Sequence, residues 1–190
     1  MSSKIIYCKD FKESKIRYAN YVRNHINNVQ EVYNLTEEAF KEVFPEVYAD
    51  SVSTKVLYNN IKNHDKSKFN DNELYGYSAK FFPINGTDPE SEEVKKVFQI
   101  SWLRHIHNNP HHPAYWTLPD DGIFMILDMP DIYIIEMLCD WMAMSKYYNS
   151  TTLEYWNSKS AKQLPMSVNT ISKVNKFMQY MKDNNSHTLW

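Results

Sequence analysis

The amino-acid sequence predicts an all-α fold, a single-domain helical bundle over residues 1–190 with flanking tails at 1–10 and 183–190. The 190 residues contain only three glycines, too little turn material for a many-stranded sandwich. The long segments repeat their apolar residues at the helical period and not at the strand period. A hydrophobic content of 43% is enough to bury one sizeable core.

Composition limits the partners that we expect. A formal net charge of −2 gives no reason to predict a strong, sequence-independent grip on nucleic acid. No segment approaches the roughly 20 consecutive apolar residues of a membrane span, and the N-terminus lacks a signal-peptide core. Only Cys8 and Cys139 occur, so a disulfide framework is not expected. We therefore expect an intracellular, cytoplasmic protein without a membrane partner.

The first helix is expected over residues 11–34 and turns His25 inward. A histidine on an inward face is either a core residue bonded to the backbone or a metal ligand. Thr36 is then expected to cap a short second helix that ends near Pro45. The positions that share the inward face of the first helix are Tyr18, Val22, His25, Ile26, Val29 and Val32.

A third helix, beginning around residues 51–53, is expected to carry His64 on its buried face with Asp65 beside it. Consecutive helical side chains diverge by about 100°, so such a pair can reach a cation from two directions. An aspartate turned toward a core is costly unless it is paired or bound to a cation, which favours metal ligation over a solvated helix surface. Lys68, one turn after His64, either binds substrate oxygens or stays solvated.

A short helix over 72–82 and a long helix over 89–108 are expected next. The long helix turns His105 toward the core, whereas His107 lies on a neighbouring face. Pro110 ends this helix, and His111 and His112 follow in a loop stiffened by prolines.

Four histidines within the eight residues 105–112 indicate either a transition-metal site or a fortuitous cluster on a surface loop. Neutral imidazole is a preferred ligand of zinc, iron, nickel and copper. The chain has no paired cysteines of the zinc-finger type, so we expect a catalytic metal site rather than a structural one.

The segment 131–148 is apolar nearly all round and predicts a central, buried helix. Glu136 and Asp140 are its exceptions, and at a spacing of four residues they share a face. Buried carboxylates need cations, which are either metal ions or, in a structural alternative, Lys146 or Arg23. A segment around Trp156 and an amphipathic helix after residue 167 complete the expected bundle.

The order of these residues resembles that of the HD superfamily, all-helical metal-dependent phosphohydrolases. The segment His64-Asp65-Lys66-Ser67-Lys68 is similar to the HDxxK segment of the HD-GYP cyclic-dinucleotide phosphodiesterases, and His111-His112 resembles their paired histidines. The Gly-Tyr-Pro signature of that group is missing, since Pro113-Ala114-Tyr115-Trp116 stands there. The sequence as a whole also resembles an uncharacterised family of small Firmicute and phage proteins.

The resemblance implies an HD-domain-like fold that holds one or two divalent transition metals, from among Fe, Mn, Ni, Co and Zn. It implies a first metal with the ligands His25, His64, Asp65 and Asp140. Asp65 is expected to bridge to a second metal held by His111, His112 and either His105 or His107. The inward face of the helix favours His105.

The chemistry that these ligands imply is hydrolysis of a nucleotide or another small phosphoester by metal-activated water. Catalytic roles are expected for Asp65, Lys68 and Glu136, the last by orienting ligands. By residue type, the expected substrate-binding residues are Lys68, Arg104, Tyr115, Trp116 and Lys146. Two alternatives stay open, a di-iron oxygenase of the same superfamily and a non-enzymatic module that binds a metal or ligand.

Overall fold

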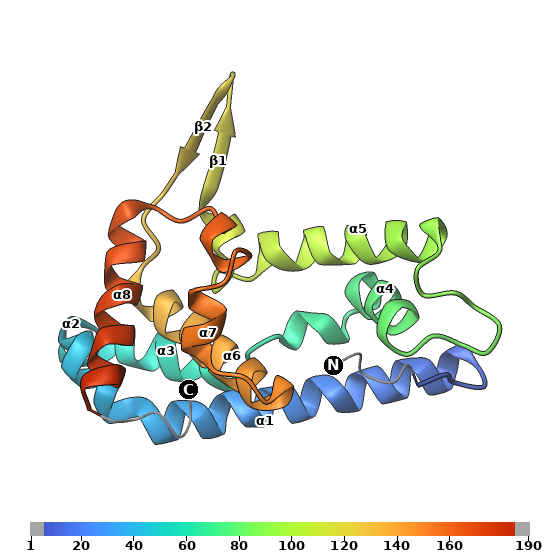
Figure 1. Ribbon diagram of the computed structural model, residues 1–190, viewed down its shortest axis with the longest axis horizontal. Coiled ribbons are helices and arrows are strands. Elements are labelled where there is room, and N and C mark those ends of the chain that lie inside the picture. The colour runs from blue at the N-terminus through green and yellow to red at the C-terminus, as the bar shows by residue number, and fades with distance from the viewer. Residues whose placement is uncertain (1–5, 185–190) are drawn as a thin grey trace. The chain divides into compact units, whose positions relative to one another are not determined.

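The protein is mostly helical, which confirms the all-α prediction (Figure 1). A computed structural model describes residues 6–184 of the chain. The chain divides into two compact units. Unit 1 comprises Met1–Asn24 and Asp65–Asn109, and unit 2 comprises His25–His64 and Pro110–Trp190. Helix α1 (Phe11–Val43) begins in unit 1 and ends in unit 2.

Unit 1 consists of the start of α1, the short 3-10 helix η1 (Lys66–Phe69), α4 (Asp71–Phe81) and α5 (Glu92–Asn108). Helix α5 begins at a serine cap, because the Ser91 side chain accepts a hydrogen bond from the backbone N–H of Val94. Helices α4 and α5 meet at Gly76, where an added Cβ atom would lie 2.5 Å from the backbone oxygen of Val97. This close approach holds together the two helices that carry Glu73 and His105.

Unit 2 is built around α6 (Asp131–Tyr148), whose buried residues occupy nearly every face, as the sequence predicts. Around it lie α2 (Pro45–Ala49), α3 (Ser51–Lys62), α7 (Thr152–Trp156), η3 (Ala161–Gln163) and α8 (Val168–Asp183). Ser167 caps α8, in agreement with the predicted start of the last amphipathic helix. The fully buried core residues of this unit include Val29, Phe40, Leu57, Ile134, Leu138, Met142 and Phe177.

The prediction of a break in the first helix is wrong, because α1 continues without interruption to Val43. Thr36 is buried, and its hydroxyl donates to the backbone oxygen of Val32 one turn earlier, at 2.7 Å. A threonine that bonds to the preceding turn sits inside a helix and does not cap a new one.

The prediction that His64 and Asp65 lie on a helix is also wrong. Helix α3 ends at Lys62, and Asp65 adopts a left-handed backbone with a φ of 55°. An L-residue in that conformation cannot continue a right-handed helix, and aspartate is among the few that tolerate it. The pair therefore sits in a tight turn before η1. The expected burial is nevertheless confirmed, since His64 is 1% and Asp65 2% exposed.

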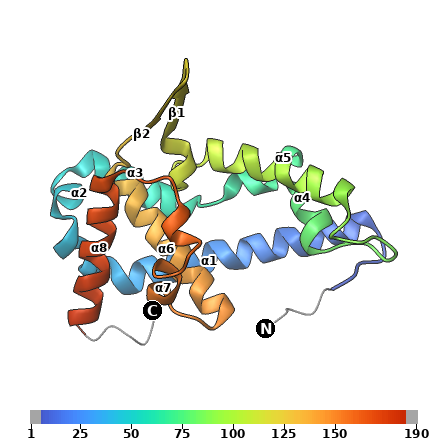
Figure 2. The same ribbon diagram turned by 45° about the horizontal axis from the view of Figure 1, so that its top comes forward.

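Unit 2 contains a β-hairpin in a segment that the sequence predicts to be a loop. It follows η2 (Pro113–Trp116) and pairs β1 (Thr117–Asp120) with β2 (Ile123–Ile126) in antiparallel register, with Thr117 opposite Ile126 (Figure 2). Asp121 and Gly122 form its tip with positive φ angles of 37° and 85°. Asp-Gly is a preferred dipeptide for two-residue hairpin turns, a signal that helical periodicity does not detect.

The two predicted flanking tails, 1–10 and 183–190, are described by the structure to different extents. Cys8 is buried, its N–H donates to the backbone oxygen of Pro83, and its own oxygen accepts from the N–H of Asn85, both at 2.8 Å. Asp183 is the last residue of α8, and the tail beyond Asn184 lies outside the described residues. Cys8 and Cys139 are both free thiols. Among the helices of residues 6–184, none has the length and apolar character needed to cross a membrane.

We predict that Gly76→Ala destabilises the protein by about 1–3 kcal/mol. The added methyl group would overlap the Val97 backbone and the Ser101 hydroxyl, and overpacking of this kind outweighs the gain in helix propensity of up to about 1 kcal/mol. Urea denaturation measures the change, with exposed Asn72→Ala on the same helix as the control. An unchanged or higher free energy of unfolding for Gly76→Ala would show that α4 and α5 are not in close contact.

Candidate metal centre

The contact between His64 and Glu136 defines the centre of unit 2. The Nδ1 atom of His64 lies 2.9 Å from Oε1 of Glu136, and both side chains are buried. The turn after α3 positions the histidine, and the central helix α6 positions the carboxylate. Because an ionised carboxylate only accepts hydrogen bonds, the proton of a neutral His64 ring resides on Nδ1, and Nε2 carries a lone pair.

The other side of the His64 ring faces a second carboxylate. Its Nε2 atom lies 3.7 Å from Oδ1 of Asp140, and Nε2 of His25 lies 3.0 Å from the same oxygen. Two donor atoms bound to one ion at about 2.1 Å, at the angles of tetrahedral or octahedral coordination, are about 3.0–3.4 Å apart. The ligand atoms of His25, His64 and Asp140 all lie within 4.8 Å of one another, so these residues can hold a metal ion.

Both carboxylates of α6 are ionised at neutral pH. Burial raises the pKa of Glu136, but the charge and hydrogen bond of His111 and the hydrogen bond of His64 outweigh it and lower the pKa from 4.5 to about 2. Burial likewise raises the pKa of Asp140, and the hydrogen bond from His25 together with the neighbouring His64 ring holds it well below its usual value. The centre therefore offers fixed negative charge to a cation.

Glu136 also orients a second histidine. Nδ1 of His111 lies 3.1 Å from Oε1 of Glu136, the oxygen that His64 contacts, and the two imidazole rings are 4.3 Å apart. His64, His111 and Glu136 form a further group with metal-ligand spacing. Since Nε2 of His64 already faces Asp140, we interpret Glu136 as the acceptor for both Nδ1–H groups.

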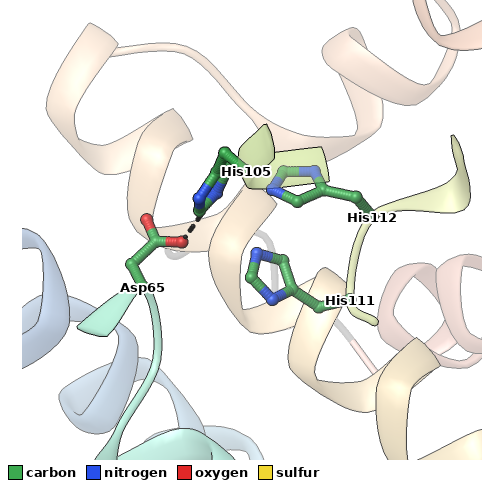
Figure 3. Close-up of side chains that lie close together, drawn as sticks. All are labelled: Asp65, His105, His111 and His112. Atoms are coloured by element: carbon green, nitrogen blue, oxygen red, sulfur yellow. Dashed lines mark ion pairs between the residues drawn. The ribbon is translucent and has the colours of Figure 1, made fainter. Parts of the chain in front are cut away.

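The loop that carries His111 and His112 is braced by hydrogen bonds. The Trp116 indole N–H donates to the backbone oxygen of Pro110 at 2.8 Å, and the N–H of Tyr115 donates to the oxygen of His112 at 3.0 Å. The centres of the His111 and His112 rings lie 4.2 Å apart. Figure 3 shows the two side chains side by side. Two adjacent imidazoles therefore lie on a short loop that internal hydrogen bonds hold in place.

A second cluster lies within unit 1 around Asp65 and His105. Nε2 of His105 is 3.1 Å from Oδ1 of Asp65, the ion pair marked by the dashed line in Figure 3. Lys68 donates to the other oxygen of Asp65, and its Nζ atom lies 5.3 Å from the centre of the Tyr77 ring. His105 is fully buried, whereas His107 is exposed. The structure thus places His105, and not His107, against an acid.

The nominated substrate-binding residues have varied surroundings. Tyr115 is exposed, and the Trp116 ring packs 5.6 Å from that of Tyr133. Arg104 is exposed and donates to the backbone oxygen of Asn72 at 3.4 Å. Lys146 forms a surface pair with Glu31 at 2.8 Å.

The structural alternative for the two acids of α6 named Lys146 and Arg23 as partners. In unit 2 both acids contact histidines, while Lys146 is engaged by Glu31. Arg23 belongs to unit 1, where it donates to the Asn20 side chain at 2.9 Å.

Sequence reasoning missed Glu73, a buried acid of unit 1. Its Oε2 atom lies 2.9 Å from Nδ1 of His105 and accepts from the Ser67 hydroxyl at 3.0 Å. In sequence it looks like an acid that favours the start of α4. The spacing of Glu73, Gly76 and Tyr77 on one helix face was the signal that it points inward.

Residues 14–181 match the protein family described as "Family of unknown function (DUF5662)". The chain belongs to this family. The matched range includes all the histidines and acids of both clusters. No curated protein and no solved structure matches the chain. Resemblance to the HD superfamily stays a prediction, and the site is interpreted from its own chemistry.

We predict that the metal-free protein loses stability in acid through Glu136. Its folded-state pKa of about 2 lies below the ordinary 4.5, so its contribution is present above pH 4.5 and is lost as the pH falls toward 2. Wild type should exceed Glu136→Gln in free energy of unfolding by up to about 3 kcal/mol at neutral pH. Urea denaturation in chelator at several pH values measures this gap. A gap that stays constant down to about pH 3 contradicts the assignment.

Proposed function

We propose that the protein is a metal-dependent phosphohydrolase that acts on a nucleotide or another small phosphoester. The observation that carries the proposal is the trio His25, His64 and Asp140, whose ligand atoms lie within 4.8 Å of one another. The resemblance of the ordered histidines and aspartates to the HD superfamily supports the same reaction class.

The donor set fits a divalent transition metal. Two imidazole nitrogens and one carboxylate oxygen suit Mn, Fe, Co, Ni or Zn, whereas soft copper(I) prefers thiolates. Cys139 precedes Asp140, but burial, aided by the charges of Glu136 and Asp140, raises the pKa of its thiol well above 9. Its thiol therefore stays protonated at neutral pH in the metal-free protein, and among the described residues Cys139 belongs to none of the groups with metal-ligand spacing.

Three protein ligands leave a coordination position for water, the arrangement of catalytic rather than structural metal sites. A metal ion held by these residues would act as a Lewis acid that polarises a phosphoryl oxygen and lowers the pKa of bound water toward about 7. The Asp140 side chain is 17% exposed, so solvent has a path to the edge of the site.

The chain's own residues have separable tasks in this proposal. Glu136 holds the proton of His64 on Nδ1 and so directs Nε2 toward Asp140. Asp140 neutralises part of the cation's charge. The substrate-binding roles of Lys68 and Arg104, which belong to unit 1, stay predictions from their residue types. The bridging role of Asp65 toward a second metal stays a prediction from the resemblance.

We predict that Asp140→Asn lowers phosphate release at least about 100-fold, because it removes the charged ligand of the proposed trio and so weakens metal binding. The assay uses protein stripped by chelator, reloaded with Mn, Fe, Co, Ni or Zn, and given a panel of nucleotides and small phosphoesters. Asp131→Asn is the matched control, because this aspartate starts the same helix and pairs with Lys173.

Two results would overturn the proposal. One is the absence of phosphate release from every compound of the panel with every metal. The other is tightly held mixed-valent iron together with oxygen consumption, which would favour the oxygenase.

A further inference from the structure

We propose that Glu73 is a positioning residue that fixes the tautomer of His105, so that Nε2 of this histidine presents a lone pair beside Asp65. This inference extends the proposed function and rests on it for one point only, that His105 binds a metal ion. The argument for the tautomer itself depends on contacts within unit 1.

Burial makes Glu73 costly unless its charge is compensated. The residue is 4% exposed, in the first turn of α4. A buried carboxylate needs hydrogen-bond donors or a cation; its Oε2 atom accepts from the Ser67 hydroxyl at 3.0 Å and lies 2.9 Å from Nδ1 of the His105 ring. A helix-start acid without another task would lie at the surface, where water solvates it.

Asn109, the C-cap residue that follows α5, donates to two of the neighbouring groups. Its amide Nδ2 donates to the Ser67 oxygen at 2.9 Å and to the backbone oxygen of His105 at 2.8 Å. The Ser67 hydroxyl oxygen is thus an acceptor toward Asn109, and its hydrogen is directed to Glu73. Glu73 then receives a second hydrogen from Nδ1 of His105.

Two arrangements compete, and both need a lone pair on Nδ1 of His105: the Ser67 hydroxyl lies 3.3 Å from that nitrogen and can donate to it. The Asn109 amide also lies 3.0 Å from Nδ1 of His105, so it can donate to that nitrogen if the ring proton is on Nε2. In either arrangement a lone pair on Nδ1 would face the Glu73 carboxylate at 2.9 Å, which is repulsive. The Asp65 carboxylate lies 3.1 Å from Nε2 and would repel a lone pair there as well, but Lys68 donates a hydrogen bond to Asp65 and compensates its charge. Glu73 receives instead the hydrogen of the neutral Ser67 hydroxyl, so its charge favours the proton on Nδ1 and the lone pair on Nε2.

Unit 2 contains the same chain of groups. There the Glu136 carboxylate faces Nδ1 of His64, and Nε2 of His64 faces Asp140. In each unit a buried glutamate contacts one ring nitrogen and an aspartate lies beside the other, although the two sets of residues come from different parts of the chain. A carboxylate behind the histidine is the usual means of setting which nitrogen binds a metal.

The test has two readouts. The ¹⁵N chemical shifts of the His105 ring, measured by NMR in ¹⁵N-labelled protein, show which nitrogen carries the proton, and competition with a chelator gives the affinity for Zn²⁺. For metal-free wild type we expect the Nδ1–H tautomer. In Glu73→Gln the amide can donate to Nδ1, so we expect the proton to move to Nε2 and the Zn²⁺ affinity to fall about 10–100-fold. Ser67→Ala keeps the carboxylate, so we expect the Nδ1–H tautomer to persist.

Glu93→Gln is the matched control, since this exposed glutamate occupies the first turn of α5 in the same unit. We expect it to change neither the tautomer nor the affinity. A proton on Nε2 in metal-free wild type overturns the inference without any variant. An unchanged Zn²⁺ affinity in a folded Glu73→Gln protein overturns the positioning role. Because neither readout involves turnover, an absence of phosphohydrolase activity leaves both results interpretable.

Discussion

The hydrogen bond from His64 to Glu136 is the interaction on which the candidate site depends. Helix α6 is buried on nearly all sides, so a carboxylate at position 136 has no route to bulk water and must be satisfied internally. His64 and His111 supply its hydrogen bonds, and each ring uses its Nδ1 atom to do so. The direction of the remaining nitrogen of His64, toward Asp140 and the His25 side chain, follows from this one contact.

Helical periodicity in the sequence correctly predicts the burial of the site residues that lie on helices. His25 and His105 lie on helices whose apolar stripes fix which positions face inward, and both are buried. Glu136 and Asp140 share a face because four residues separate them on α6. The turn at His64 and Asp65 could not be derived in this way, because the left-handed backbone of Asp65 replaces the expected helix. Burial of the pair was predicted correctly from an incorrect local structure.

The features that the sequence did not predict depend mostly on contacts that form only in the folded chain. Thr36 looks like a helix cap in sequence, yet in the folded chain its hydroxyl bonds within α1. Glu73 looks like an acid of a helix start, and only the packing of α4 against α5 at Gly76 places it behind His105. The hairpin β1–β2 depends on a two-residue turn at Asp121 and Gly122, which helical reasoning does not consider. Tertiary packing therefore decides which acids act as hydrogen-bond acceptors for histidines.

The central claim is that His25, His64 and Asp140 bind one metal ion through Nε2, Nε2 and a carboxylate oxygen. The most direct measurement is a crystal structure of protein loaded with Mn²⁺ or Zn²⁺, with the ion located by its anomalous scattering. The account predicts an ion about 2.0–2.3 Å from these three atoms, with Glu136 still within hydrogen-bond distance of His64 Nδ1. An ion bound elsewhere, or none at this trio under saturating metal, would contradict it.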